Sequence, residues 1–167
     1  CRDVKDWFNF YGREWNVPVL GIETYRGVDA VTSSHTKGIV GQLKAMVPEL
    51  EKIAGTKLDT SKFEETVALS RRCSDLWKEV LDKGAQKPSP LTFFDGTIHM
   101  GPAVVLRGTQ QAVDYYELLL TELNQRIDEN VAAVPNERFR LYWEGMPVWG
   151  KLRDLSGLFN NLETCVV

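Results

Sequence analysis

Few side chains in the sequence are suited to metal binding or acid–base chemistry. The three cysteines, Cys1, Cys73 and Cys165, lie far apart and form no C-x-x-C pair, and their odd number argues against a secreted disulfide framework. A metal site built from histidines would need both His35 and His99, although a histidine at a helix start, such as His35, is more often a cap or a surface residue. The sequence contains no G-x-G-x-x-G, P-loop, H-E-x-x-H or G-x-S-x-G motif, so the enzyme classes defined by these motifs lose support.

The residues around each cysteine favour structural roles when they are considered alone. Cys73 lies on the apolar stripe of a predicted long helix, between Leu69 and Trp77, and is predicted to be a core residue. Cys165 lies in an apolar segment and is predicted to be buried in the same way. Cys1 begins a stretch with helical periodicity and reads as a small, partly buried helix residue.

The last 30 residues predict a strand, a helix and a second strand. Residues 138–143 are predicted to be a strand, residues 144–148 a loop and residues 149–162 a helix, and Cys165 opens the next strand. This order is a βαβ unit with parallel strands. Ligands of open parallel sheets bind beyond the carboxyl ends of the strands, which is where residues 143–147 would lie.

The loop after this first strand combines a carboxylate with a glycine and apolar side chains. Glu144 could donate a proton if it is buried, since burial favours the protonated form of a carboxyl group. Gly145 would permit close approach of a ligand to the backbone, and Trp143 and Met146 would form an apolar wall. The alternative is a tight turn in which Glu144 is solvated and Pro147 begins the next helix.

The remaining elements predict an α/β protein with a helical middle. The apolar run at residues 17–22 is bounded by turn residues and is predicted to be a buried strand. Helices are predicted from His35 to Ala54 before Gly55, from about residue 60 to Gly84, and from Thr109 to about Val131. Residues 91–108 mix aromatic residues, three glycines and a proline, which is typical of an irregular turn or short helix that could line a cleft.

Composition and charge exclude some classes of function. The chain of 167 residues carries a net charge of −3, which would repel nucleic acid and anionic lipid. No run approaches the roughly 20 apolar residues of a membrane span, and the first residues have no apolar signal region, so a cytoplasmic location is expected. Both ends have the pattern of an interrupted element, and we expect an internal piece of a longer protein.

Three segments resemble a known family. The sequence R-L-Y-W-E-G-M-P-V-W-G-K-L at residues 140–152, the opening C-R-D-V-K-D-W-F and the run V-P-V-L-G-I-E resemble cluster-binding subunits of the benzoyl-CoA reductase and 2-hydroxyacyl-CoA dehydratase family. The chain most resembles the B-type subunits of the benzoyl-CoA reductases. This implies an α/β fold truncated at both ends: the end of a first Rossmann-like domain in residues 1–34, a helical region in residues 35–135, and the start of a second Rossmann-like domain in residues 136–167.

The resemblance also implies a cofactor. Members of the family hold a 4Fe–4S cluster through three cysteines in each subunit, so Cys1 would be one thiolate ligand and the other two would lie outside this sequence. Neither Cys73 nor Cys165 matches a ligand position. The family's partners are a paralogous cluster-binding subunit and an ATP-hydrolysing activator that supplies electrons, with ATP used only by that activator.

The activity implied is the reduction of an aryl-CoA thioester to a cyclic dienoyl-CoA. Glu144 is then the candidate catalytic residue, and Trp143, Gly145 and Met146 are the candidate substrate-binding residues. The alternative within the family is a 2-hydroxyacyl-CoA dehydratase, in which a ketyl radical expels hydroxide. An alternative of another class is a non-catalytic α/β interaction subunit that docks a partner through its Trp- and Tyr-rich faces. A piece of this length is not expected to be active alone.

Overall fold

The computed structural model describes residues 2–27 and 29–167, which form two compact units. The first unit ends at Asp59, and the second spans Thr60–Val167. Both are mainly helical, and the second also contains a two-stranded parallel sheet. No helix within the described residues is long and apolar enough to cross a membrane. The chain is thus a mixed helical fold with a small parallel sheet, while the Rossmann-like domains and the boundaries at residues 34 and 135 remain predictions.

The first unit contains two helices, α1 (Arg2–Glu14) and α2 (Ser33–Ala54). Reciprocal hydrogen bonds between Thr32 and His35 cap the start of α2. Thr32 Oγ1 accepts from the backbone N–H of His35, and His35 Nδ1 accepts from the backbone N–H of Thr32, both at 3.3 Å. Gly55 ends α2 with φ at 66°. The predicted helix and the predicted cap role of His35 are therefore confirmed.

The strand predicted for residues 17–22 is wrong. The segment has no regular secondary structure and pairs with no strand in the described part of the chain. Val19 lies close against α1, where a Cβ on Gly12 would overlap it. Just beyond, Glu23 N–H donates to Gln42 Oε1 (2.8 Å) and Glu23 O accepts from Gln42 Nε2 (3.1 Å). A glutamine amide offers the same donor and acceptor as a peptide group, so Gln42 of α2 replaces a neighbouring strand at this residue.

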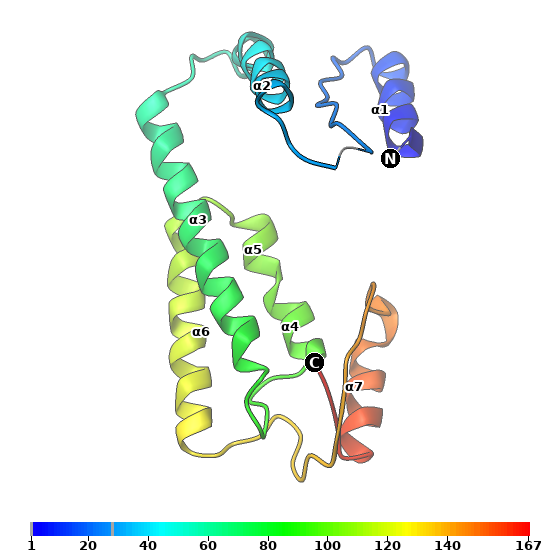
Figure 1. Ribbon diagram of the computed structural model, residues 1–167, viewed down its shortest axis with the longest axis vertical. Helices are drawn as coiled ribbons and strands as arrows, with labels where there is room; N and C mark the ends of the chain where they lie inside the picture. The colour runs from blue at the N-terminus through cyan, green and yellow to red at the C-terminus, as the bar shows by residue number, and fades with distance from the viewer. Residues whose placement is uncertain (1, 28) are drawn as a thin grey trace. The chain divides into compact units, whose positions relative to one another are not determined.

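Helices build most of the second unit. They are α3 (Thr60–Lys83), α4 (Phe93–His99), α5 (Gly101–Val105) and α6 (Gln110–Asp128), and α3 packs along α6 (Figure 1). The two long helices agree with the predicted ones, and the irregular segment forms the two short helices. The core between them contains buried apolar residues and one buried tyrosine: Cys73, Leu76, Val80, Leu91, Ala103, Ala112, Val113, Tyr116, Leu119, Leu120 and Leu123. The predicted core role of Cys73 is thereby confirmed.

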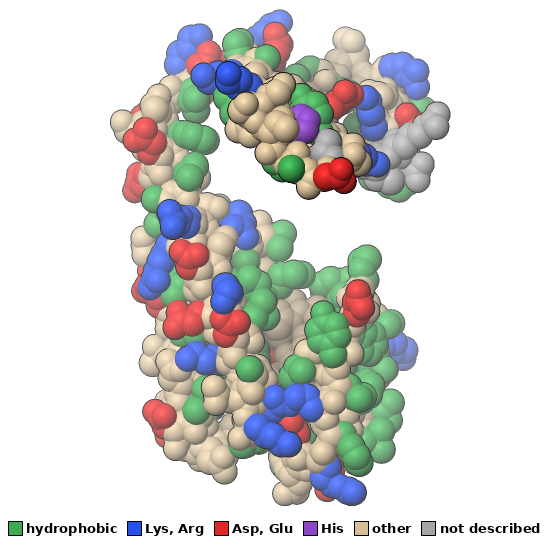
Figure 2. Space-filling view, in the orientation of Figure 1, with side chains coloured by type: hydrophobic (Ala, Val, Ile, Leu, Met, Phe, Trp, Pro, Cys, Tyr) green, Lys and Arg blue, Asp and Glu red, His purple; other side chains and the backbone are tan. Residues whose placement is uncertain are grey.

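The predicted βαβ unit is confirmed. It consists of β1 (Phe139–Leu141), the 3-10 turn η1 (Trp149–Lys151), α7 (Leu152–Asn161) and β2 (Thr164–Val166), and β1 and β2 are parallel. The strand β1 is shorter than the predicted strand at residues 138–143, and β2 begins one residue before Cys165. The space-filling view shows hydrophobic side chains gathered over α7 and the loop before it (Figure 2).

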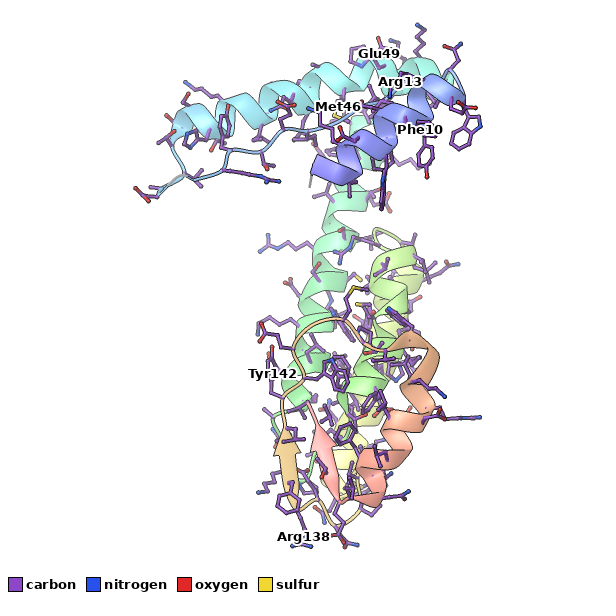
Figure 3. The ribbon with its side chains drawn as sticks, turned by 90° about the vertical axis from the view of Figure 1, so that its right-hand side faces the viewer. Phe10, Arg13, Met46, Glu49, Arg138 and Tyr142 are labelled. Carbon is purple, nitrogen blue, oxygen red and sulfur yellow. The ribbon has the colours of Figure 1, made fainter. Side chains whose placement is uncertain are left out.

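The two strands differ in burial. All of β2 is buried, and Cys165 at its centre is completely inaccessible, as predicted. In contrast, β1 is partly exposed. Figure 3 shows Arg138 and Tyr142 at opposite ends of β1, with the Tyr142 side chain projecting away from the strand, and this side chain is 80% exposed.

One ion pair fixes the sheet to the helices. The Arg140 guanidinium contacts the Glu137 carboxylate at 2.7 and 2.8 Å and also donates to the carbonyl oxygens of Gly84 (3.1 Å) and Gln86 (2.8 Å), just beyond the end of α3. The Glu137 side chain is only 3% exposed and accepts from the backbone N–H of Ser89 (3.1 Å). The arginine lowers the pKa of Glu137. This charge-assisted network ties β1 to the C-terminal end of α3.

Tyr116 joins α6 to the short helices. Its side chain is completely buried, and its hydroxyl accepts from Ala103 N–H (2.9 Å) and donates to His99 O (2.7 Å). Burial raises the pKa of Tyr116 to about 12. The hydroxyl therefore remains protonated and satisfies two backbone groups at the junction of α4 and α5.

Replacing Tyr116 by Phe is expected to lower the free energy of unfolding by about 1–3 kcal/mol, because the buried Ala103 N–H loses its partner. The shift can be measured by urea unfolding followed by circular dichroism. The same replacement at the exposed Tyr142 is the control and should change the free energy by less than about 0.5 kcal/mol. Equal unfolding midpoints for Tyr116→Phe and wild type would show that the hydroxyl does not stabilise the fold.

Acid should weaken the network around Glu137. Because the folded-state pKa of Glu137 is lowered, the unfolded chain binds more protons, and the stabilisation is present above the unfolded pKa and lost as pH falls through the folded one. In Glu137→Gln, the free energy of unfolding should therefore decrease less than in wild type as the pH falls from about 5 to about 3. Glu79→Gln, at an exposed position of α3, is the matched control. Identical pH slopes for Glu137→Gln and wild type would contradict this linkage.

Candidate functional site

The loop predicted to carry the site leaves the carboxyl end of β1. The pairing with β2 continues beyond the strands, since Val167 N–H donates to Leu141 O (2.8 Å) and Trp143 N–H donates to Val167 O (3.2 Å). The backbone then turns at Gly145, which has φ at 101°. An L-residue is strained in that conformation, so glycine is required by the turn itself.

Trp143 anchors this loop through an aromatic cluster. Its ring is stacked on Phe93 of α4, with ring centroids 5.5 Å apart and planes at 14°. The edges of Phe94 and Phe159 complete the cluster at 6.2 and 6.5 Å. Offset stacks and edge contacts are the favoured arrangements of aromatic rings. Trp143 therefore fixes the start of the loop between α4 and α7.

A pocket of about 340 Å³ lies beside this loop. Gly145 and Pro147 follow β1 and Val167 follows β2, so the carboxyl ends of both strands open onto the pocket. In Figure 1 the C-terminus lies next to α4, which forms another wall. The lining residues come from α3, α4 and the segments beside them and from the two strand ends: Trp77, Leu81, Gly84, Leu91, Thr92, Phe93, Gly96, Thr97, Met100, Gly145, Pro147 and Val167.

The chemistry of the pocket is apolar. None of its lining side chains is charged, and both lining hydroxyls are already engaged as donors at α4. Thr92 Oγ1 donates to Asp95 Oδ2 (2.8 Å), and Thr97 Oγ1 donates to Phe93 O (2.9 Å). A carboxylate would find no side-chain donor there, and its burial would carry a desolvation cost. The pocket is thus suited to an apolar group.

The predicted site residues take different positions. Gly145 lines the pocket, whereas Trp143 is held in the aromatic cluster and is not a lining residue. Met146 is 79% exposed, and Glu144 is also exposed. Within the described chain, Glu144 makes no ion pair and no side-chain hydrogen bond.

Most of the pocket residues are not singled out by the sequence. Trp77 and Leu81 look like ordinary positions on the apolar stripe of α3, and Phe93, Gly96 and Met100 belong to no motif. The one available signal is the composition of residues 91–108, whose aromatic residues and glycines predict a cleft lining. The lining residues of α4 and its flanking positions come from this segment.

The cysteines and histidines in the described residues form no metal site. Cys1 lies outside those residues. Cys73 and Cys165 are completely buried, and burial raises the pKa of the Cys165 thiol. His35 caps α2, and His99 Nδ1 lies 2.6 Å from Tyr115 Oη. No three His, Cys, Asp or Glu side chains are grouped for metal binding in residues 2–27 and 29–167.

A second hollow, of about 660 Å³, lies in the first unit between α1 and the extended segment after it. Its lining includes Lys5, Glu23 and Arg26 beside apolar residues. Lys5 Nζ lies 2.6 Å from Glu23 Oε1, which neutralises two of these charges. The predicted loop lines the apolar pocket of the second unit, so that pocket is the candidate site.

Comparison with known proteins agrees with the resemblance seen in the sequence. The whole chain, residues 1–167, matches the family described as 2-hydroxyglutaryl-CoA dehydratase, D-component. It is 34% identical over 157 residues to the alpha subunit of the (R)-2-hydroxyglutaryl-CoA dehydratase of Acidaminococcus fermentans, covering 93% of this chain and 33% of that protein. It is 31% identical over 177 residues to the B-type subunit of the benzoyl-CoA reductase of Thauera aromatica, covering 100% of this chain and 41% of that protein.

A third relative is the (R)-2-hydroxyisocaproyl-CoA dehydratase alpha subunit of Clostridioides difficile, 32% identical over 152 residues, which cover 89% of this chain and 37% of that protein. The chain spans about a third to two-fifths of the length of these three relatives. The resemblance carried by residues 140–152 and the two shorter segments is confirmed, because the match extends over all of them. The chain belongs to the 2-hydroxyglutaryl-CoA dehydratase D-component family, and its relatives include dehydratase alpha subunits and a B-type benzoyl-CoA reductase subunit.

Proposed function

We propose that this chain is part of a catalytic subunit that reduces the aromatic ring of an aryl-CoA thioester to a cyclic dienoyl-CoA. The observation that carries the proposal is the apolar pocket at the carboxyl ends of β1 and β2. It lies in a chain whose whole length matches a family of acyl-CoA dehydratase and reductase subunits. Apolar pockets with few polar groups at their edge are the usual form of a small-molecule site.

An aromatic acyl group fits the chemistry of this pocket. Trp77 and Phe93 supply aromatic faces, and Met100 supplies a polarizable thioether, so a ring can make stacking and sulfur–aromatic contacts. An acyl group bearing a carboxylate would find no hydrogen-bond donor among the lining side chains, because none of them is charged and both lining hydroxyls already donate to other groups. The CoA thioester then lies toward the loop that carries Gly145.

The loop would supply the polar chemistry. Gly145 gives the thioester close access to the backbone, and Met146 covers the acyl group on the solvent side. Trp143 holds the loop in place through Phe93. Glu144 delivers a proton as the ring takes up electrons, a role that needs the bound substrate or another part of the protein to cover its exposed side chain.

The cofactor proposed for this subunit is the 4Fe–4S cluster, with Cys1 as the thiolate that this chain contributes. The described residues do not form a ligand set, and Cys73 and Cys165 are inaccessible, so the remaining ligands must come from elsewhere. When bound, such a cluster supplies single electrons at low potential. The proposed partners are a paralogous cluster-binding subunit and an ATP-hydrolysing activator.

A second candidate is a 2-hydroxyacyl-CoA dehydratase subunit, favoured by the names of two of the three relatives described above. The two activities can be separated by product analysis. The anaerobically purified protein with its partner and activator should convert benzoyl-CoA to a dienoyl-CoA with electron consumption, whereas a dehydratase would convert an (R)-2-hydroxyacyl-CoA to an enoyl-CoA. Failure to process either thioester, in a protein without iron, would favour a non-catalytic interaction subunit.

The role of Cys1 predicts a specific loss of iron. In the intact protein, Cys1→Ser should lower the iron content and abolish turnover, because a hydroxyl oxygen is a poorer donor to this iron than a thiolate. Cys73→Ser changes a buried core residue and is the matched control, with unchanged iron expected. Equal iron loss in the two variants would remove the reason for assigning Cys1.

The role of Glu144 predicts a loss of turnover alone. Glu144→Gln keeps the shape of the side chain but removes its ionisable proton, so turnover should fall by roughly 100-fold if Glu144 delivers a proton. Iron content and melting temperature should stay at wild-type values. The exposed Glu129→Gln controls for loss of a negative charge. Wild-type turnover in Glu144→Gln would contradict proton delivery by Glu144 and would leave the loop with a structural role alone.

A further inference from the structure

Gly96 is a glycine that the protein's own packing does not explain. It lies inside α4, where glycine costs about 1 kcal/mol relative to alanine. Its φ is not in the left-handed region, and an added Cβ would meet only Leu81 Cδ2, at the ordinary contact distance of 3.9 Å. In contrast, a Cβ on Gly12 or Gly38 would overlap Val19 or Tyr25, so packing requires glycine at those two positions.

The space that Gly96 leaves open belongs to the apolar pocket. Gly96 is buried and lines the pocket, and so does Leu81, the one neighbour that an added Cβ would meet. An added Cβ would therefore overlap nothing, and a larger side chain would extend toward Leu81 and the pocket that Leu81 lines. The pocket holds about 340 Å³, near the lower end of the range for small-ligand sites, so one added side chain would remove a substantial part of it.

We infer that Gly96 sets the depth of the pocket and thereby determines which acyl groups it admits. This inference rests on the proposed function, in which the pocket receives the acyl group of a CoA thioester. The group admitted is uncharged and bulky, an aromatic ring or a branched hydrocarbon, because the lining offers apolar surface and the hydroxyls of Thr92 and Thr97 are already engaged. An acetyl group is too small to reach the depth that Gly96 provides.

The backbone of Gly145, at the edge of the pocket, offers a hydrogen-bond donor beside the apolar lining. Its backbone N–H makes no hydrogen bond within the described residues, although the residue lines the pocket. It is thus available to the carbonyl oxygen of a thioester, the one strong acceptor beside the acyl group. Gly96 of α4 thus admits the hydrocarbon part of the acyl group, and Gly145 of the loop after β1 accommodates the thioester carbonyl.

The test compares two thioesters that differ only in the acyl group. Binding of benzoyl-CoA and acetyl-CoA to the intact protein is measured by isothermal titration calorimetry for wild type, Gly96→Ala and Gly96→Leu. Gly96→Leu should weaken benzoyl-CoA binding by roughly 10- to 100-fold, the usual effect of filling a hydrophobic pocket, and leave acetyl-CoA binding within about 3-fold. Gly96→Ala should have a smaller effect in the same direction. Gly157→Leu, on the exposed side of α7, is the matched control and should change neither affinity.

Each outcome decides the inference. Unchanged benzoyl-CoA affinity in Gly96→Leu, or an equal loss for both thioesters, would overturn it while leaving an acyl-CoA activity intact. Absence of binding of either thioester by the wild-type protein would instead remove the proposed function and this inference with it. If Gly96→Leu does not fold, Gly96→Ala decides alone, because alanine favours the helix and meets no clash. A selective loss of benzoyl-CoA affinity in that variant supports the inference, and equal affinities overturn it.

Discussion

The contacts of the Arg140 guanidinium are the constraint on which the candidate site depends. The pocket has walls from two substructures, the helices α3 and α4 and the ends of the strands β1 and β2. Arg140 fixes β1 to the carbonyl groups that follow α3, and Glu137 is buried beside it to balance its charge. This link holds the strand ends at one position relative to α3. The aromatic contacts of Trp143 with α4 complete the attachment on the other side of the strand.

The site separates a rigid apolar part from an exposed polar part. Most of the pocket is built from helices and strand ends whose backbones are hydrogen bonded, so those walls are fixed before a ligand arrives. Glu144 and Met146 lie beyond it on an exposed loop. This arrangement separates a surface that recognises shape from a loop that carries an ionisable side chain.

The sequence predicts those features that depend on local patterns. Apolar periodicity and caps identify α2, α3 and α6, and the order of patterns near the C-terminus identifies the βαβ unit. The strand predicted at residues 17–22 is not formed, because an apolar run does not show whether a strand is available to pair with it. Within the described residues no strand pairs with this segment, and Gln42 of α2 bonds the backbone of the next residue, Glu23. The pocket is foreseen only at residues 143–147, of which Gly145 and Pro147 line it, and in the composition of residues 91–108. Trp77 and Gly96 could not be recognised, because membership of a pocket depends on which elements meet in three dimensions.

The ring of Phe93 has two neighbours at once, because one side of it is stacked on Trp143 and the residue also lines the pocket. A ligand that displaces the Phe93 ring must disturb its stacking on Trp143, which holds the loop. Conversely, a movement of the loop that shifts Trp143 must change the pocket wall that Phe93 forms. Such an energetic coupling is reciprocal by thermodynamic necessity. The occupancy of the pocket and the position of the loop that carries Glu144 are therefore linked for any ligand that moves the Phe93 ring.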